Sequence, residues 1–377
     1  MTTPNEAEKL YEELKTQSLH LPDLRLKFQD WPQGDNVRLD DIRVEADKMI
    51  RSVTEDKEML DNAERSDMGH LASLWYPKAG WTELQVGAAY LAWVFIWDDE
   101  IDLGMSETAK SSELGREYCD KSLDYINKSM GLNYDWRNSK AEDIPHPYRY
   151  MRIFEKFGFG LRAADEDQRW QAYKGLRDYI AQVGVEHSRQ LNGHFPTSKE
   201  YLAMRRGTAG VAPVAGCTEF MNGVKLPAWL RHSREMEVLA REATMMCLII
   251  NDLYSAHKEV ASKTLQNYVV VLYAECEPRS LGQSVKALLD LLDESKTAFN
   301  KAVESLEKQV ERDAELGKNL RACIDTHRHF VTGLIEWTLT SARYKMDKYL
   351  QKDGSFIIPL VPGKATNGRG ESAPITM

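Results

Sequence analysis

The feature that most constrains this chain is a long apolar run that ends in a cluster of acids. The run is YLAWVFIWDDEID at residues 90–102, and four of its last five residues are acidic. On an α-helix, Asp98 and Asp102 would lie one turn apart on one face, and Phe95 would continue that face toward the apolar end. The sequence therefore predicts a buried helix whose acidic end lies at the mouth of an apolar pocket.

The acids at this helix end need a counter-charge. Carboxylates at the C-terminal end of a helix oppose the helix dipole, so a compensating cation is expected. Carboxylate oxygens are hard ligands that suit magnesium, which usually takes one or two of them and fills its other positions with waters and phosphate oxygens. One interpretation is therefore a metal site at Asp98 and Asp102, which share one face of the helix. The alternative is a helix end that turns into solvent.

A second polar motif follows a second apolar run. The motif is NDLYSAHKE at residues 251–259. Asn251, Ser255 and Glu259 are four residues apart, so they drift by only about 80° around a helix and rise by about 12 Å. An amide, a hydroxyl and a carboxylate on one stripe could hold one hard cation, and Lys258 on the same stripe could contact a phosphate. The alternative is a polar break between two helices.

Helical spacing dominates the rest of the chain. Apolar residues recur at three- and four-residue spacing within residues 81–102, 148–164, 201–220, 231–254, 280–310 and 318–349. The short acidic run at residues 165–167 is expected to be a solvated turn. The sequence predicts an all-α fold with a single domain at residues 21–354, a mobile N-terminal segment at residues 1–20 and a loose C-terminal tail at residues 355–377.

The composition excludes some partners and environments. The net charge of −9 argues against a nucleic-acid partner, which would need a basic face. The five cysteines are scattered and match no metal-ligand spacing, so they are expected to be reduced thiols in a cytoplasmic protein. The polar N-terminus lacks the features of a signal peptide, and no run reaches the ~18 apolar residues of a membrane span, so no stable membrane anchor is expected.

Together the two polar motifs resemble those of class I terpene synthases. The segment DDEID at residues 98–102 resembles their aspartate-rich DDxxD motif, and Asn251, Ser255 and Glu259 resemble their NSE triad. The resemblance covers roughly residues 60–350. A chain-elongating prenyltransferase would carry a second aspartate-rich motif at the place of the triad, so the resemblance favours cyclisation over elongation.

A further match to this family lies between the two motifs. Arg205 lies 46 residues before Asn251, at the separation where microbial members carry an arginine that senses diphosphate. Thr208 and Ala209 then occupy the linker and effector positions of the family. The family often has an acidic linker, so Thr208 is a departure that puts the details of the ionisation trigger in doubt.

The C-terminal region resembles the family in another place. Arg343 and Tyr344 match its Arg-Tyr pair, which hydrogen-bonds diphosphate. Trp337 lies about two turns before Tyr344 on the expected helix, and from there it could present its π face to a carbocation. Phe95, on the stripe below Asp98, is expected to be a second wall residue. Alone, an Arg-Tyr pair or a helical Trp would be structural, and only their place in the ordered set of motifs gives them weight.

The resemblance implies the α-helical bundle of the class I isoprenoid synthases and a sesquiterpene cyclase of microbial or fungal type, which is a carbon-oxygen lyase acting on phosphates. Farnesyl diphosphate is the expected substrate, with geranyl and geranylgeranyl diphosphates as alternatives. A non-catalytic helical homologue is the contrasting interpretation, and the sequence leaves a homodimer open.

The same resemblance implies a role for each motif residue. Three magnesium ions are expected, two at Asp98, with Asp99 or Asp102 in support, and one at the NSE triad. Four further side chains would complete the diphosphate site, Arg205, Lys258, Arg343 and Tyr344. Ionisation of the substrate would then depend most directly on Asp98, Arg205, Arg343 and Tyr344.

Overall fold

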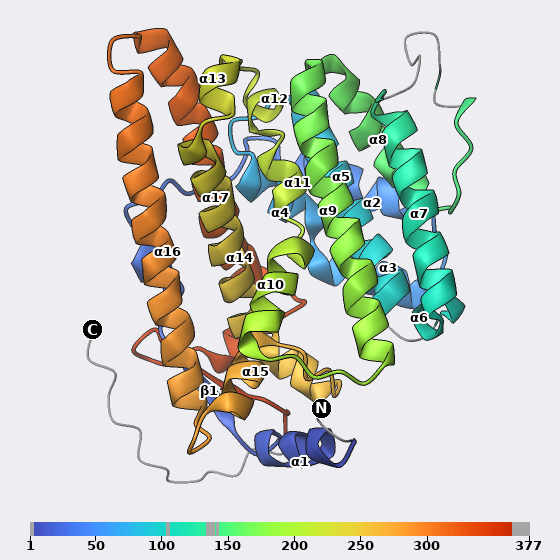
Figure 1. Cartoon of the computed structure of the whole chain (residues 1–377), viewed down its shortest axis with the longest axis vertical. Helices are drawn as coiled ribbons and strands as arrows, with labels where there is room; N and C mark the ends of the chain where they lie inside the picture. Colours follow the sequence, from blue (N-terminus) through green and yellow to red (C-terminus); the bar gives the residue numbers. More distant parts are fainter. Residues whose placement is uncertain (1–3, 103–105, 133–139, 141–142, 364–377) are drawn as a thin grey trace.

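Long helices run side by side along the molecule, and shorter helices close its ends (Figure 1). The computed structural model describes residues 4–102, 106–132, 140 and 143–363. Its helices, short 3-10 helices (η) and strands are α1 (Pro4–Leu14), β1 (Ser18–Leu21), η1 (Leu24–Phe28), α2 (Leu39–Arg51), α3 (Lys57–Ser66), α4 (Met68–Trp75), α5 (Trp81–Asp102), α6 (Glu107–Lys110), α7 (Ser112–Ser129), α8 (Met151–Gly160), η4 (Leu161–Ala163), α9 (Glu166–Leu191), α10 (Ser198–Thr208), α11 (Ala212–Ala215), α12 (Thr218–Asn222), α13 (Ala228–Arg231), α14 (Arg234–Ala261), α15 (Tyr268–Glu275), α16 (Leu281–Gln309), α17 (Ala314–Thr340), η5 (Met346–Tyr349) and β2 (Phe356–Pro359). The predicted all-α fold is confirmed.

Helix α5 lies in the interior of this bundle. It is apolar on almost every side, as expected for a helix that others surround, and it packs against α8, α2 and α4. The side chains of Trp93 and Trp97 are fully buried. The Trp93 ring lies edge-on to Phe154, and the Trp97 ring stacks on Tyr118. These large contacts fix the rotation of α5, and therefore the direction in which its acidic end points.

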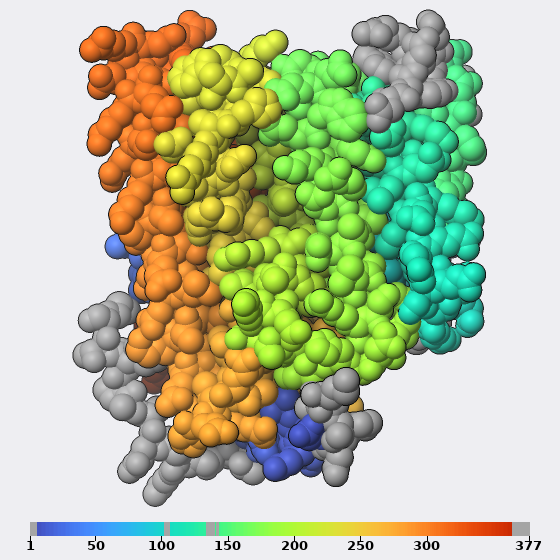
Figure 2. All heavy atoms as spheres, in the orientation of Figure 1, coloured from blue at the N-terminus to red at the C-terminus, as the bar shows by residue number. Residues whose placement is uncertain are grey.

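The other helix that carries a predicted metal motif, α14, packs against α16 and α17. Ser233 caps its N-terminal end by accepting a hydrogen bond from the backbone N–H of Met236, which satisfies one of the free donors of the first turn. Figure 2 shows one face of the molecule, on which the side chains of α7, α9, α10 and α16 lie. Both predicted motifs thus belong to long helices that the fold holds from several sides.

Two predicted helices end earlier than expected. The helix expected over residues 201–220 is broken into α10, α11 and α12, because Gly210 has a φ of +69° and Pro213 follows at the start of α11. The helix expected over residues 318–349 ends at Thr340. Its last residues form turns instead, and Lys345 adopts a left-handed backbone with a φ of 54°.

The two ends of the chain also differ from the prediction. Residues 18–20 were expected in a mobile segment and residues 356–359 in a loose tail, but residues 18–21 pair with residues 356–359 as an antiparallel two-stranded sheet. The physical reason is alternation, since Leu19, Leu21, Phe356 and Ile358 all face the core and are 3% exposed or less. Residues 1–3 and 364–377 of those predicted segments lie outside the described residues. Within the part of the chain that is described, no helix is long and apolar enough to cross a membrane.

Candidate active site

The acidic end of α5 carries two carboxyl groups that are held in a largely buried setting. Asp98 Oδ1 accepts a hydrogen bond from the Tyr179 hydroxyl at 2.7 Å. Burial raises the pKa of Asp98 to about 6, although that hydrogen bond opposes the change. Burial also raises the pKa of Asp99, against the opposing effect of the nearby Arg343 and Lys258. Two neighbouring carboxyls that resist ionisation in this way lack a sufficient counter-charge.

The third predicted acid of this motif, Asp102, is the last residue of α5. Its side chain lies outside the described residues, so its predicted role as a metal ligand stays a prediction.

The predicted triad lies within α14. Asn251 Nδ2 donates to the Tyr344 hydroxyl at 3.3 Å. Ser255 is 1% exposed, and Glu259 Oε2 accepts a hydrogen bond from Asn267 Nδ2 at 2.9 Å. Because the three side chains share one stripe of a continuous helix, the amide, the hydroxyl and the carboxylate face the same side, as the spacing predicts.

Arg205 of α10 is the link between its own helix and α14. Its Nη2 donates to Asn251 Oδ1 at 2.8 Å, its Nε to Asp252 Oδ1 at 3.2 Å, and its Nη1 to the Thr208 carbonyl at 3.0 Å. Asp252 is 1% exposed and also accepts a hydrogen bond from the Tyr201 hydroxyl at 2.6 Å. Arg205 therefore contacts the triad region directly, and its expected role in sensing diphosphate stays a prediction. Ala209 follows as the C-terminal cap of α10.

Two further cationic side chains, those of Arg343 and Lys258, lie close to the acidic end of α5. The Arg343 guanidinium lies 5.2 Å from the centre of the Phe95 ring, and its Nη1 donates to Ser66 Oγ at 3.0 Å. Among the described residues its buried Nε has no hydrogen-bond partner. The Lys258 ammonium lies 5.5 Å from the centre of the Tyr344 ring, and burial lowers the pKa of Lys258 to about 8. An incompletely satisfied, buried pair of cations is a setting that favours an anionic ligand.

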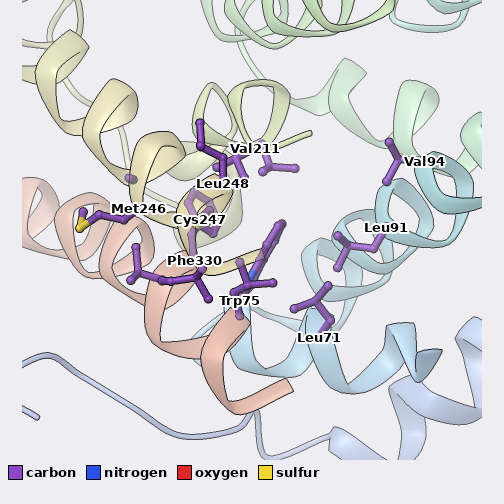
Figure 3. Close-up of a cluster of buried hydrophobic side chains, with 14 of the residues drawn as sticks. Leu71, Trp75, Leu91, Val94, Val211, Met246, Cys247, Leu248 and Phe330 are labelled. Carbon is purple, nitrogen blue, oxygen red and sulfur yellow. The ribbon is translucent and has the colours of Figure 1, made fainter. Parts of the chain in front are cut away.

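Aromatic rings line the boundary between this polar region and the core. The Trp337 ring meets Phe95 and Tyr344 edge to face, with centroids 5.9 and 5.5 Å apart. Tyr344 lies beyond the end of α17 rather than on the same helix as Trp337, and the turns after Thr340 bring the two rings into contact. One turn before the two metal motifs, Val94 and Cys247 belong to a buried apolar cluster contributed by several helices (Figure 3). Its labelled members are Leu71, Trp75, Leu91, Val94, Val211, Met246, Cys247, Leu248 and Phe330.

Sequence reasoning missed a contribution from α9. This helix brings Tyr179 to Asp98, and two turns further along it carries Glu186. Burial raises the pKa of Glu186 to about 7, with Arg205 opposing the shift and Asp98 adding to it. The acids beside Arg205 thus come from Glu186 and Asp252 rather than from position 208. Tyr179 and Glu186 are seven residues apart, a spacing that places both on one face of a helix. Nothing in the sequence indicated that this face contacts the two motifs.

The donor set fits hard divalent cations. Within the described residues no group of three or more His, Cys, Asp or Glu side chains is placed so that it could hold a metal ion by itself. The motifs instead offer one or two carboxylates each, with an amide and a hydroxyl from α14. Magnesium-type sites have this form when waters and substrate phosphates supply the remaining oxygens. The raised pKa values of Asp98 and Asp99 agree with carboxylates that lack such a cation.

Comparisons with known proteins agree with this site. A family model described as terpene synthase family 2, C-terminal metal binding, matches residues 89–298, which include the acids at 98–102 and the triad. The chain is 26% identical over 330 residues to terpene cyclase braA of Annulohypoxylon truncatum, covering 87% of this chain and 86% of the relative. It is 24% identical over 360 residues to sesquiterpene cyclase hepA of Aspergillus oryzae, covering 92% and 94%.

Solved structures show the same fold. The structure of α-eudesmol synthase superposes with a TM-score of 0.67 at 16% identity, covering 82% of this chain and 97% of that one. Linalool/nerolidol synthase from Streptomyces clavuligerus, solved in complex with 2-fluorogeranyl diphosphate, gives a TM-score of 0.67 at 18% identity, covering 83% and 98%. At these identities the likeness is one of fold.

Proposed function

The chain belongs to terpene synthase family 2, and on that premise we propose that it is a sesquiterpene cyclase acting on farnesyl diphosphate. The enzyme ionises this substrate to a farnesyl cation and diphosphate and closes the cation into one or more rings. The cyclic cation then becomes neutral by losing a proton, which the diphosphate can accept, or by adding water and losing a proton, and diphosphate is released. Terpene cyclase activity follows from the family and from the relatives. The fifteen-carbon substrate, the magnesium requirement and the residue roles are the proposal.

One observation carries this proposal, namely that cations and oxygen ligands from distant parts of the chain meet in one place. Arg343 and Lys258 both act on the pKa of Asp99, and Arg205 donates to Asn251. A diphosphate needs cations, and a divalent ion needs oxygens, so both requirements are met around one site. The buried Nε of Arg343, without a partner among the described residues, supports an anion as the missing ligand.

The metal ions would be held by both motifs. Asp98 and Asp99 are the ligands that we propose at the end of α5, and Asn251, Ser255 and Glu259 those on α14, for three magnesium ions in all. Bound there, magnesium supplies Lewis-acid stabilisation of the negative charge that develops on the diphosphate leaving group. Asp102 completes the aspartate-rich motif in the same proposal.

The remaining side chains act on the substrate itself. Arg205, Lys258, Arg343 and Tyr344 hydrogen-bond or ion-pair with the diphosphate and so stabilise the departing charge, because preorganised donors cost no reorganisation during the reaction. Phe95 and Trp337 present aromatic surface to the cation. The buried apolar cluster of Figure 3 excludes water, which would otherwise quench the cation early.

The proposed chain length depends on the relatives. Sesquiterpene cyclase hepA aligns with 92% of this chain, which favours the fifteen-carbon substrate. The solved complex with 2-fluorogeranyl diphosphate keeps the ten-carbon substrate as an alternative, and geranylgeranyl diphosphate is the other.

The test is an incubation of the purified protein with magnesium and, separately, geranyl, farnesyl and geranylgeranyl diphosphates, followed by gas chromatography and mass spectrometry of the organic extract. We expect a cyclic fifteen-carbon hydrocarbon or alcohol from farnesyl diphosphate, lost on chelation of the metal. A cyclic product from another substrate alone would overturn the chain length. Formation of a longer diphosphate would assign the chain to the elongating enzymes, and no turnover of any substrate would overturn the proposal.

A further inference from the structure

Asn267 is a fully buried polar side chain that joins the loop after α14 to the triad. It is 0% exposed. Its Nδ2 lies 2.9 Å from Glu259 Oε2, 2.9 Å from the Asp252 carbonyl oxygen and 3.4 Å from Ser255 Oγ. An amide nitrogen has only two hydrogens, so the two contacts at 2.9 Å are the full hydrogen bonds and Ser255 receives the weaker share.

The orientation of this amide is determined by its other end. Asn267 Oδ1 accepts a hydrogen bond from the backbone N–H of Val269 at 2.9 Å and so caps the N-terminal end of α15. Reversing the amide would place Oδ1 against the Glu259 carboxylate and the Asp252 carbonyl, which are both acceptors, and would turn the amino group toward a donor. Only one orientation therefore satisfies every contact, and it directs a donor at Glu259.

A second contact fastens the same loop to α14. The backbone N–H of Tyr268 donates to Asp252 Oδ2 at 3.1 Å. Asp252 is in turn paired with Arg205. The residues at the start of α15 therefore hold the triad helix at two points about two turns apart, one at Asp252 and one at Glu259.

We infer that Asn267 is a positioning residue for the metal site on α14. By bonding Glu259 Oε2 it fixes the rotamer of this long side chain and leaves Oε1 as the oxygen for the cation, and by contacting Ser255 Oγ it steers that hydroxyl toward the same side. Without Asn267, Glu259 would sample several rotamers, and ordering it would cost conformational entropy at each binding event. The inference rests on the proposed function, because it concerns the metal site of that same reaction.

Two substitutions separate this role from helix capping. Asn267→Asp keeps an oxygen for the Val269 N–H but replaces the donor with a second acceptor beside Glu259, so it repels the carboxylate. Asn267→Ser still caps α15, since serine is a good capping residue, but it is too short to reach Glu259. The control is Ser233→Ala, which removes the N-terminal cap of α14, at the end of the triad helix that is far from Glu259.

The measurement is the binding of manganese in the presence of inorganic diphosphate, followed through the loss of the free-ion signal in electron paramagnetic resonance. Partners that orient metal ligands typically contribute 10–100-fold to metal affinity. We expect a loss of that size for Asn267→Asp, a smaller loss for Asn267→Ser and no change for Ser233→Ala. Turnover by Asn267→Asp should recover toward wild type at high magnesium, which general damage to the fold would not allow.

The outcomes distinguish this inference from the proposed function. If wild-type protein binds manganese with diphosphate and both Asn267 variants bind equally well, the positioning role is wrong and the proposed function stands. If the wild-type protein itself binds no manganese under these conditions, the proposed metal site is wrong, and the inference falls with it. A loss that excess magnesium does not recover also overturns the positioning role.

Discussion

The two metal motifs differ in how far their geometry is fixed before any ligand arrives. On α14 the triad extends over the last three turns of a 28-residue helix, and Arg205, Tyr344 and Asn267 hold its side chains from three other parts of the chain. On α5 the acids occupy the last turns of the helix, and Asp98 is held by the hydroxyl of Tyr179. The α14 site is thus already assembled by polar contacts.

The same contrast appears in the electrostatics. The α14 region pairs its buried Asp252 with Arg205 in a direct contact. Burial raises the pKa of Asp252 as well as those of Asp98 and Asp99, but among the described residues neither Asp98 nor Asp99 forms such a direct ion pair with a basic side chain. One motif therefore contains its own counter-charges, whereas the other requires them from outside. The comparison teaches that α14 provides a rigid half of the site and α5 a half that is completed by the cations it binds.

The largest expected effect is on stability and concerns α14. Arg205→Met would leave Asp252, 1% exposed, as a buried charge without its partner. Removing one partner of a buried ion pair typically costs about 3–5 kcal/mol, which chemical denaturation would measure. The control is Arg177→Met on α9, where both partners of the pair with Asp178 are exposed, so its loss should cost less than about 1 kcal/mol. Equal losses in the two variants would show that α14 has no special internal pairing.

The next effect is on activity and concerns α5. Asp98→Asn keeps an acceptor for Tyr179 but removes the charge that we propose for metal binding, so turnover should fall by about 10²–10³-fold, the range for loss of a preorganised electrostatic group. The free protein should be as stable as wild type or more so, because a buried carboxyl with a raised pKa is removed. Glu83→Gln, in the first turn of the same helix, is the control. A marked loss of stability in Asp98→Asn would contradict the contrast between the motifs.

A third test uses pH on the metal-free protein. Burial raises the pKa of Asp98 from 3.8 to about 6 and that of Glu186 from 4.5 to about 7. For each group, at a pH between its ordinary pKa and its raised pKa in the folded protein, the folded state binds more protons than the unfolded state. These two groups therefore make the folded protein less stable as the pH rises from about 4 to about 7.

The dependence of stability on pH has a limited size and can be assigned to particular residues. One pKa unit corresponds to about 1.4 kcal/mol, so each group contributes at most about 3 kcal/mol, and partial access of water reduces this. We expect Glu186→Gln to flatten the dependence of the melting temperature on pH between about 4 and 7, and magnesium with diphosphate to offset the loss at high pH. If Glu186→Gln left the pH dependence of the melting temperature unchanged, Glu186 of α9 would not contribute to that dependence.

The helices that carry the motifs were predictable because each is an apolar run closed by polar residues. The predicted bounds of α5 are those of the structure, and Asn251, Ser255 and Glu259 share a face as their spacing requires. Helix α9 was not predicted, and its glycines are one reason. Gly175 reads as a helix breaker, but a Cβ there would lie 2.8 Å from the backbone of Pro213. Its absence of a side chain is a packing requirement, which the sequence does not reveal.

The partners of the motif residues were harder to predict than the motifs themselves. Tyr179 and Glu186 lie on the helix that was missed, and Asn267 returns to Glu259 only after α14 has ended and the chain has reversed. Such contacts depend on the packing of one element against another, whereas a motif depends on the period of one helix. Sequence spacing therefore located the candidate ligands, and only the fold could show what holds them.

The smallest expected effect tests the one hydrogen bond that Asp98 receives from Tyr179. Tyr179→Phe removes the hydroxyl and leaves the ring, so the packing against Trp97 remains. A hydrogen bond to a charged group contributes about 1.5–3 kcal/mol, and magnesium bound at Asp98 should recover part of it, so we expect turnover to fall only about tenfold. The magnesium concentration at half-maximal rate should rise. Tyr125→Phe, which removes a buried hydroxyl without a hydrogen-bond partner among the described residues, is the control.

The result for Tyr179→Phe bears directly on the contrast between the two motifs. If α5 is the half that bound cations complete, its positioning contact should matter less than that of the triad, and Tyr179→Phe should weaken manganese binding less than Asn267→Asp does. An equal or greater loss in Tyr179→Phe would mean that the hydroxyl fixes Asp98 as firmly as the amide fixes Glu259. The two halves of the site would then be equally preorganised, and the raised pKa of Asp98 would reflect burial alone.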